Sequence, residues 1–125
     1  MRPTMLITVA LLLCAGSVQA QPLWTWTLYE DPDALALANE VPDTSQLAAV
    51  LECKPGSGSA KVSVFPKGAT SQRPVLRQFP TTDAAFVEFV KTGKLSFTAE
   101  GGSGEIAMDT EHRAKLERFA RLCGA

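Results

Sequence analysis

The chain has 125 residues, of which 46% are hydrophobic and 20% charged, and its formal net charge is −1. This length suits one ordinary globular domain and leaves no room for a second. The near balance of 12 basic and 13 acidic residues argues against a protein that binds nucleic acid electrostatically, because such a protein needs a basic excess on one face.

Residues 1–20 have the pattern of a secretory signal peptide. Arg2 gives a short positive region, residues 5–15 form an apolar run, and Ala20 ends a cleavage site of small residues. We therefore expect residues 21–125 to form a single exported domain, located in the periplasm or secreted.

Two other fates of this leader are less consistent with the sequence. A retained anchor needs roughly 20 apolar residues to span a bilayer, and the run is shorter. A lipid-modified Cys14 would follow a small residue, whereas Leu13 precedes it. No stable membrane insertion is expected after cleavage.

The stretch 112–123 predicts an amphipathic helix that covers the core. Its apolar residues recur at helical spacing, namely Leu116, Phe119, Ala120 and Cys123. Its other face carries a basic run interleaved with Glu117, namely Arg113, Lys115, Arg118 and Arg121. The simplest interpretation of that run is the solvent-exposed side of the helix. Asp109 or Thr110 is the expected N-cap.

Cys53 and Cys123 are the two cysteines left after removal of the leader. An even pair in an oxidising compartment predicts a disulfide, which would fasten the last helix to the fold. The bond would close a loop of about 70 residues and add roughly 4 kcal/mol in the chain-entropy model. Bonds from each cysteine to partner chains are the competing arrangement.

The rest of the domain is expected to consist mainly of short strands. Period-2 patterns or turn boundaries mark 24–29, 34–38, 47–53, 61–65, 75–79, 95–99 and a return strand around Ile106 and Met108. Residues 34–38 are ambiguous between strand and helix, and strand is preferred because Leu35 and Leu37 alternate. Residues 54–59 are expected to be a flexible hairpin loop, and 101–104 a turn.

One further helix is expected before the late hairpin. Phe86, Phe89 and Val90 have helical spacing, with Thr82 or Asp83 as N-cap. Gly93 follows as the C-cap. The predicted fold is α+β: a small antiparallel β-sandwich or partial barrel with a short helix, a C-terminal amphipathic helix and one disulfide.

Catalytic patterns are missing from the sequence. The single histidine, His112, stands near Asp109 and Glu111, and no serine lies in a Gly-x-Ser-x-Gly elbow. A small metal site at His112 is the alternative to a solvated helix terminus whose acidic residues complement the helix dipole. We expect no catalytic residue, no metal and no cofactor.

Two groups of residues are candidates for binding. Asp31 and Asp33 lie in an acidic turn that would attract a basic partner, although turn chemistry alone also explains them. Trp24 and Trp26 share one strand face and would stack on sugar rings or anchor a partner, unless they belong to the core.

The chain also resembles the small exported β-sandwich proteins of Gram-negative bacteria, many of which have no assigned function. The resemblance depends on Trp24 with Trp26, Leu51-Glu52-Cys53, 104–108 and 116–123. It implies an exported β-rich fold and assigns no catalytic or binding residue.

Three functions follow as hypotheses. The first is a non-catalytic binding module for another periplasmic or envelope protein, using the loops 54–59 and 66–72 or the acidic turn. The second is a carrier of a small apolar or sugar ligand between sheet and helix, in a cavity lined by Trp26, Phe86 and Phe89. A third is a small hydrolase whose carboxylates would be supplied by Asp31, Asp33 and Asp43.

Overall fold

A computed structural model describes residues 23–66 and 73–124. These ranges contain β1 (Thr25–Glu30), β2 (Leu35–Glu40), β3 (Leu47–Cys53), β4 (Ser59–Val64), β5 (Val75–Pro80), α1 (Ala84–Thr92), β6 (Lys94–Ala99), β7 (Gly102–Ala107) and α2 (Arg113–Cys123). The expected leader, 1–20, and most of the 66–72 loop lie outside them. Neither helix of the described ranges has the length and apolar character needed to cross a membrane.

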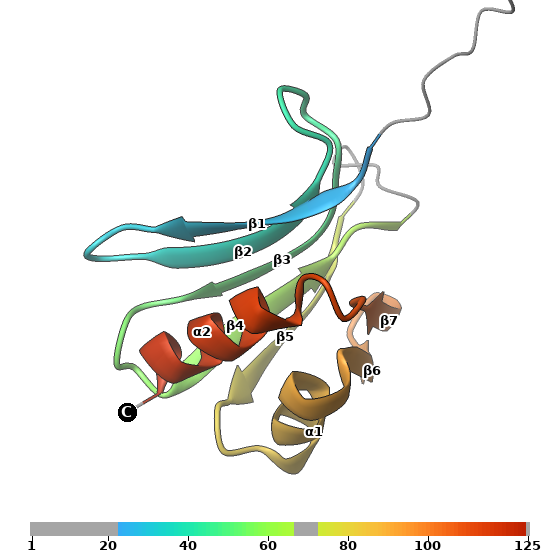
Figure 1. Cartoon of the computed structure of the whole chain (residues 1–125). Coiled ribbons are helices and arrows are strands. Elements are labelled where there is room, and N and C mark those ends of the chain that lie inside the picture. The colour runs from blue at the N-terminus through green and yellow to red at the C-terminus, as the bar shows by residue number, and fades with distance from the viewer. Residues whose placement is uncertain (1–22, 67–72, 125) are drawn as a thin grey trace, which may run out of the picture.

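The first five strands form one antiparallel sheet in chain order, and β6 pairs with β7 in a separate hairpin. The sheet is not closed into a barrel. Figure 1 shows both helices and the β6–β7 hairpin on the same side of the sheet. The predicted α+β class, with an antiparallel sheet, a short helix and a C-terminal helix, is therefore confirmed.

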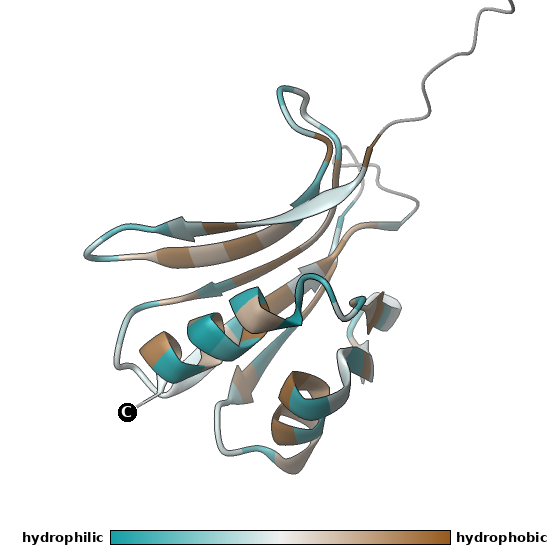
Figure 2. Cartoon of the chain, in the orientation of Figure 1, coloured by the Kyte–Doolittle hydropathy of each residue, from teal (hydrophilic) through white to brown (hydrophobic). Residues whose placement is uncertain are grey.

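The ambiguous segment is a strand. β2 pairs with β1 and β3, and its register places Leu37 opposite both Leu28 and Leu51. Leu35 and Leu37 are buried. Hydrophobic residues alternate along β2 with less hydrophobic ones (Figure 2), so this period-2 pattern outweighs the helix preference of alanine and leucine.

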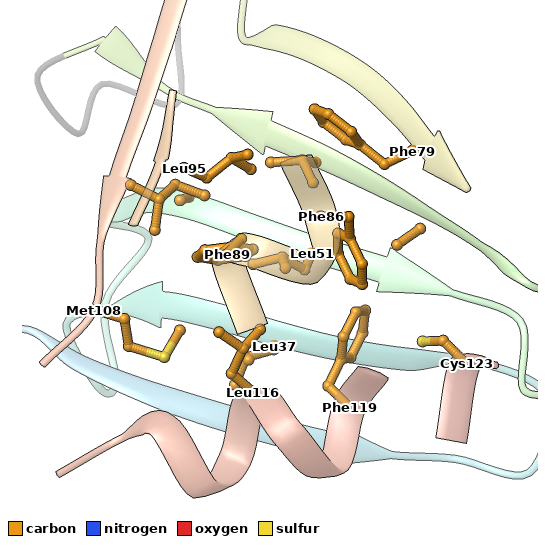
Figure 3. Close-up of a cluster of buried hydrophobic side chains, with 14 of the residues drawn as sticks. Leu37, Leu51, Phe79, Phe86, Phe89, Leu95, Met108, Leu116, Phe119 and Cys123 are labelled. Carbon is orange, nitrogen blue, oxygen red and sulfur yellow. The ribbon is translucent and has the colours of Figure 1, made fainter. Parts of the chain in front are cut away.

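The core lies between the sheet and the second layer. Its largest fully buried side chains come from both layers, namely Leu37, Leu51, Val62, Phe79, Phe86, Phe89, Leu116, Phe119 and Cys123. In Figure 3 the side chains of α1 and α2 point toward those of the strands. Phe79 stacks edge-on against Phe97 of β6 with ring centroids 5.6 Å apart, which ties the late hairpin to the sheet.

α2 begins where its apolar spacing predicts, but its N-cap lies two or three residues after the expected one. Its N-cap is His112, which makes no side-chain capping bond, so the expectation of Asp109 or Thr110 as N-cap is wrong. Asp109 instead closes the preceding turn, because its Oδ1 accepts the backbone N–H of His112 at 3.1 Å.

Two kinds of contact, a disulfide and backbone hydrogen bonds, hold the C-terminal end of α2 in place. Cys123 is bonded to Cys53 at the end of β3, with Cα atoms 5.9 Å apart, which confirms the predicted disulfide. The backbone N–H groups of Gly56 and Gly58 donate to the carbonyls of Leu122 and Cys123 at 2.9 and 2.7 Å. These bonds satisfy carbonyls that a helix end leaves open. The loop 54–59 is thus anchored, contrary to the flexible loop expected.

α1 has the caps that the sequence predicts. Asp83 accepts the N–H of Ala85 at 2.8 Å, and Gly93 ends the helix with φ 79°. Gly93 also contacts the segment before α2, because the N–H of Met108 donates to its carbonyl at 2.7 Å.

The turn between β6 and β7 is shorter than the expected 101–104, since β7 already begins at Gly102.

Replacing both bonded cysteines with alanine should lower the free energy of unfolding by about 4 kcal/mol, because the bond closes a loop with a sequence separation of 70. Urea unfolding followed by tryptophan fluorescence measures this loss. Reduction of the wild-type chain is the matched control and should give a similar loss. Equal stability of the oxidised, reduced and variant proteins would contradict the role assigned to the bond.

Gly93→Ala should destabilise the fold more than Gly56→Ala. Both glycines have positive φ, 79° and 74°, so both variants incur backbone strain of about 1 kcal/mol. A Cβ at Gly93 would lie 2.5 Å from the carbonyl oxygen of Met108, whereas one at Gly56 meets nothing within 4 Å. Thermal unfolding of the two variants isolates the steric part, and equal losses would show that the contact with Met108 relaxes freely.

Candidate binding site

The face of the sheet turned away from the helices carries a row of side chains from all five strands. The strand registers align its members directly opposite one another, in the order Tyr29, Ala36, Glu52, Lys61 and Gln78. We call these five residues the polar row. The row results from the alternation of side chains along each strand, because the residues next to each member in the chain point to the opposite, core-facing side.

The polar row borders a shallow hollow of about 570 Å³. Glu52 and Lys61 both line it and form an ion pair of 3.7 Å, with side chains 46% and 42% exposed. Ala36 leaves space beside this pair because its side chain is short. Further polar groups come from the adjoining turn and loop, namely Asp33, Lys54, Ser57 and Ser59. The hollow thus offers hydrogen-bond donors and acceptors, and both positively and negatively charged groups.

Tyr29 extends the polar row along the sheet surface. Tyr29 is 47% exposed, and its hydroxyl donates a hydrogen bond to Oε1 of Glu40. Glu40 is opposite Thr25, while Tyr29 is opposite Ala36, so the ring must lean back along the strands past Ala38. This course explains why Ala38 is only 5% exposed although no helix covers it. Hydrogen bonding to Glu40 and the charge of its carboxylate raise the pKa of Tyr29.

A second row beside the first is nearly flat. Its members, again in cross-strand register, are Thr27, Ala38, Val50, Ser63 and Leu76. Four of them have small or β-branched side chains, and Leu76 is exposed at the far edge. Together the two rows present a broad surface with aromatic, aliphatic and charged groups.

The polar face of α2 is not wholly exposed to solvent as expected. Lys115 Nζ donates to the carbonyl of Trp26 at 2.6 Å, and Arg118 Nε bonds Glu30 Oε1 at 2.6 Å. Both partners are on β1, one of the two edge strands of the sheet. These cations therefore attach α2 to that edge, where Lys115 also occupies one carbonyl of the strand.

His112 adds a third link between α2 and β1. Its Nδ1 lies 2.7 Å from Asp109 Oδ1, and its Nε2 lies 3.3 Å from Thr25 Oγ1. The hydrogen bond with His112 lowers the pKa of Asp109. Glu111 is close enough to form a three-residue group with them.

The carboxylate, imidazole and hydroxyl follow the order of a nucleophilic triad, but Thr25 begins an edge strand. Thr25, Asp109 and His112 line none of the hollows beside the polar row, β7, Arg118 or the helices. We interpret the group as a brace for α2.

The aromatic candidates from the sequence do not form one site. Trp24 is 40% exposed and precedes β1, whereas Trp26 is buried on the core side. Phe86 and Phe89 are core residues of α1. Trp26 reaches a hollow beside β7, Phe86 reaches a different one between the helices, and Phe89 lines neither.

The acidic candidates are also separated. Asp33 lines the hollow of the polar row, while Asp31 lines another hollow beside Arg118. Asp43 lies in the turn at the other end of β2, a strand of six residues or roughly 20 Å. The carboxylates that a hydrolase would pair are therefore not brought together.

No member of the polar row was among the site residues expected from the sequence. Period-2 alternation already predicts that Tyr29 points to the other face of the sheet from Trp26, and Glu52 to the other face from Cys53. That signal marks which residues face away from the core. It does not reveal which residues of different strands stand side by side, because strand register was not known.

Comparisons with protein-family models, with curated proteins and with solved structures find no match. The assignment of a function therefore depends on the geometry.

The pKa of Tyr29 is directly measurable because the chain has one tyrosine. Alkaline absorbance titration should give a value above the ordinary 10.0, and Glu40→Gln should lower it toward 10.0. Since the folded-state pKa is raised, the stabilising contribution of Tyr29 is complete below pH 10, the ordinary value, and is lost as pH rises above 10 through the folded-state pKa. Glu52→Gln is the control and should leave the titration unchanged. An unshifted pKa in the wild type would contradict the contact with Glu40.

Proposed function

We propose that the protein is an exported, non-catalytic binding module that recognises another envelope protein through the open face of its five-stranded sheet. The observation that carries the proposal is the polar row, which gathers side chains from every strand on the face opposite the two helices and the β6–β7 hairpin. The buried face of the sheet sets the register, so the feature that supports binding is the set of side chains on the outer face, an exposed tyrosine beside charges of both signs.

The chemistry of the face suits a protein partner. Tyr29 offers an exposed aromatic side chain held in one orientation by Glu40, and tyrosine is enriched among residues that dominate interface energies. Glu52 and Lys61 add charges of both signs, which supply orientation and specificity. The five strands span about 19 Å from β1 to β5, a width that favours a broad contact over an enclosing pocket.

Two observations support the compartment and the absence of catalysis. The Cys53–Cys123 bond is compatible with an oxidising compartment, as is the leader pattern of the sequence. The carboxylates of the hypothetical hydrolase are spread over two turns at opposite ends of β2. A periplasmic location, as in the exported β-sandwich proteins that the chain resembles, is part of the proposal.

Site-specific photo-crosslinking in intact cells tests the proposed surface. A natively exported, tagged chain carries a photoreactive residue in place of Gln78, which is exposed in the polar row. We expect one adduct of discrete mass with another protein. Adding Lys61→Glu should remove that adduct, because the change reverses a charge at the centre of the surface.

The matched control carries the photoreactive residue at Lys94, an exposed position of β6 on the other layer. It should give no adduct of that mass. Equal adducts at both positions, or an adduct insensitive to Lys61→Glu, would refute binding through the polar row. The purified chain from the same cells also gives the mass of the mature protein and so tests removal of residues 1–20.

A further inference from the structure

A groove between the two helices lies on the other layer of the fold. It has a volume of about 330 Å³, within the range of small-ligand sites. Its lining comes from α1, α2 and the residue after β5, namely Thr81, Phe86, Val87, Val90, Lys91, Ala120 and Arg121. The groove is thus separate from the polar row.

The floor of the groove is apolar. Phe86, which is 1% exposed, lies at its base, and Val90 and Ala120 are partly buried against the core. Val87, a large aliphatic residue, is 38% exposed. An alkyl chain lying here would cover apolar surface that water now contacts.

Two cations stand at the rim. Lys91 is in the last turn of α1 and Arg121 in the last turn of α2. The ion pairs within 4.0 Å that the described residues form involve other cations. Glu88 and Glu117 precede Lys91 and Arg121 by one turn on their helices without pairing with them. Each cation also complements its helix dipole, but that role leaves the ammonium and guanidinium groups available to an anion.

We propose that this groove binds a single-chain amphiphile with an anionic head group, of the class of medium-chain fatty carboxylates. The alkyl chain lies on Phe86, Val87 and Val90, and the carboxylate is held between Lys91 and Arg121. The evidence for this occupant is charge complementarity at the rim together with a small apolar floor. The proposal is independent of the partner assigned to the sheet.

Binding of decanoate, below its micelle concentration, to the full exported chain tests the proposal by calorimetry and by amide chemical shifts. Decanoate should shift residues of α1 and α2 around the groove. The double variant Lys91→Ala with Arg121→Ala should bind it about tenfold more weakly, since two exposed charge contacts are lost. Decanol should bind the wild type about tenfold more weakly than decanoate and should be insensitive to the double variant.

Two further variants keep the outcome decisive. Arg73→Ala with Lys94→Ala removes the same charge elsewhere and should leave decanoate binding unchanged. Val87→Asp, at an exposed position, should abolish binding while the fold stays intact. Equal binding of decanoate and a cationic amphiphile of the same chain length would overturn the proposal, as would undiminished binding by the double variant. A concentration-dependent dimer that Val87→Asp abolishes, without decanoate binding, would assign the groove to a second copy of the chain instead.

Discussion

The attachment of α2 across the sheet is the constraint on which the rest of the structure depends. Leu116 and Phe119 bring its apolar stripe into the core, and the Cys53–Cys123 bond joins its end to β3. The loop after β3 donates two backbone N–H groups to the last carbonyls of the helix, so hydrophobic, covalent and hydrogen-bonding contacts converge there. A domain of about 100 residues has a net stability of roughly 5–15 kcal/mol, and a bond worth about 4 kcal/mol is a large part of it.

This arrangement also gives the sheet two different faces. α1, α2 and the late hairpin lie on one side, and the other side carries the polar row from all five strands. Lys115 and Arg118 attach α2 to β1 at one edge of the sheet, through the carbonyl of Trp26 and the carboxylate of Glu30. Under our proposals, a protein partner binds the outer face of the sheet and an anionic amphiphile binds between the helices.

Local signals in the sequence were sufficient for much of the fold. Helical spacing from Leu116 to Cys123, the caps Asp83 and Gly93, and the alternation in β2 are each set by neighbouring residues. What escaped prediction depends on contacts between distant segments. Whether Lys115 faces water or a strand carbonyl is decided by the position of the helix on the sheet, and the polar row exists only through strand register. Trp26, a candidate binding residue, is instead a core residue. Its position in the strand pattern shows that Tyr29 faces away from the core.

The central claim is that the open face of the sheet is the surface by which this protein binds its partner. Hydroxyl-radical footprinting of the natively exported chain, in cells and after purification, tests it most directly. Tyr29 and Leu76 are 47% and 44% exposed, and Leu23, which is 81% exposed outside the sheet, is an internal reference. Our account predicts that Tyr29 and Leu76 are protected from oxidation in cells and react after purification, with Leu23 unchanged. Equal reactivity of Tyr29 and Leu76 in both samples would contradict it.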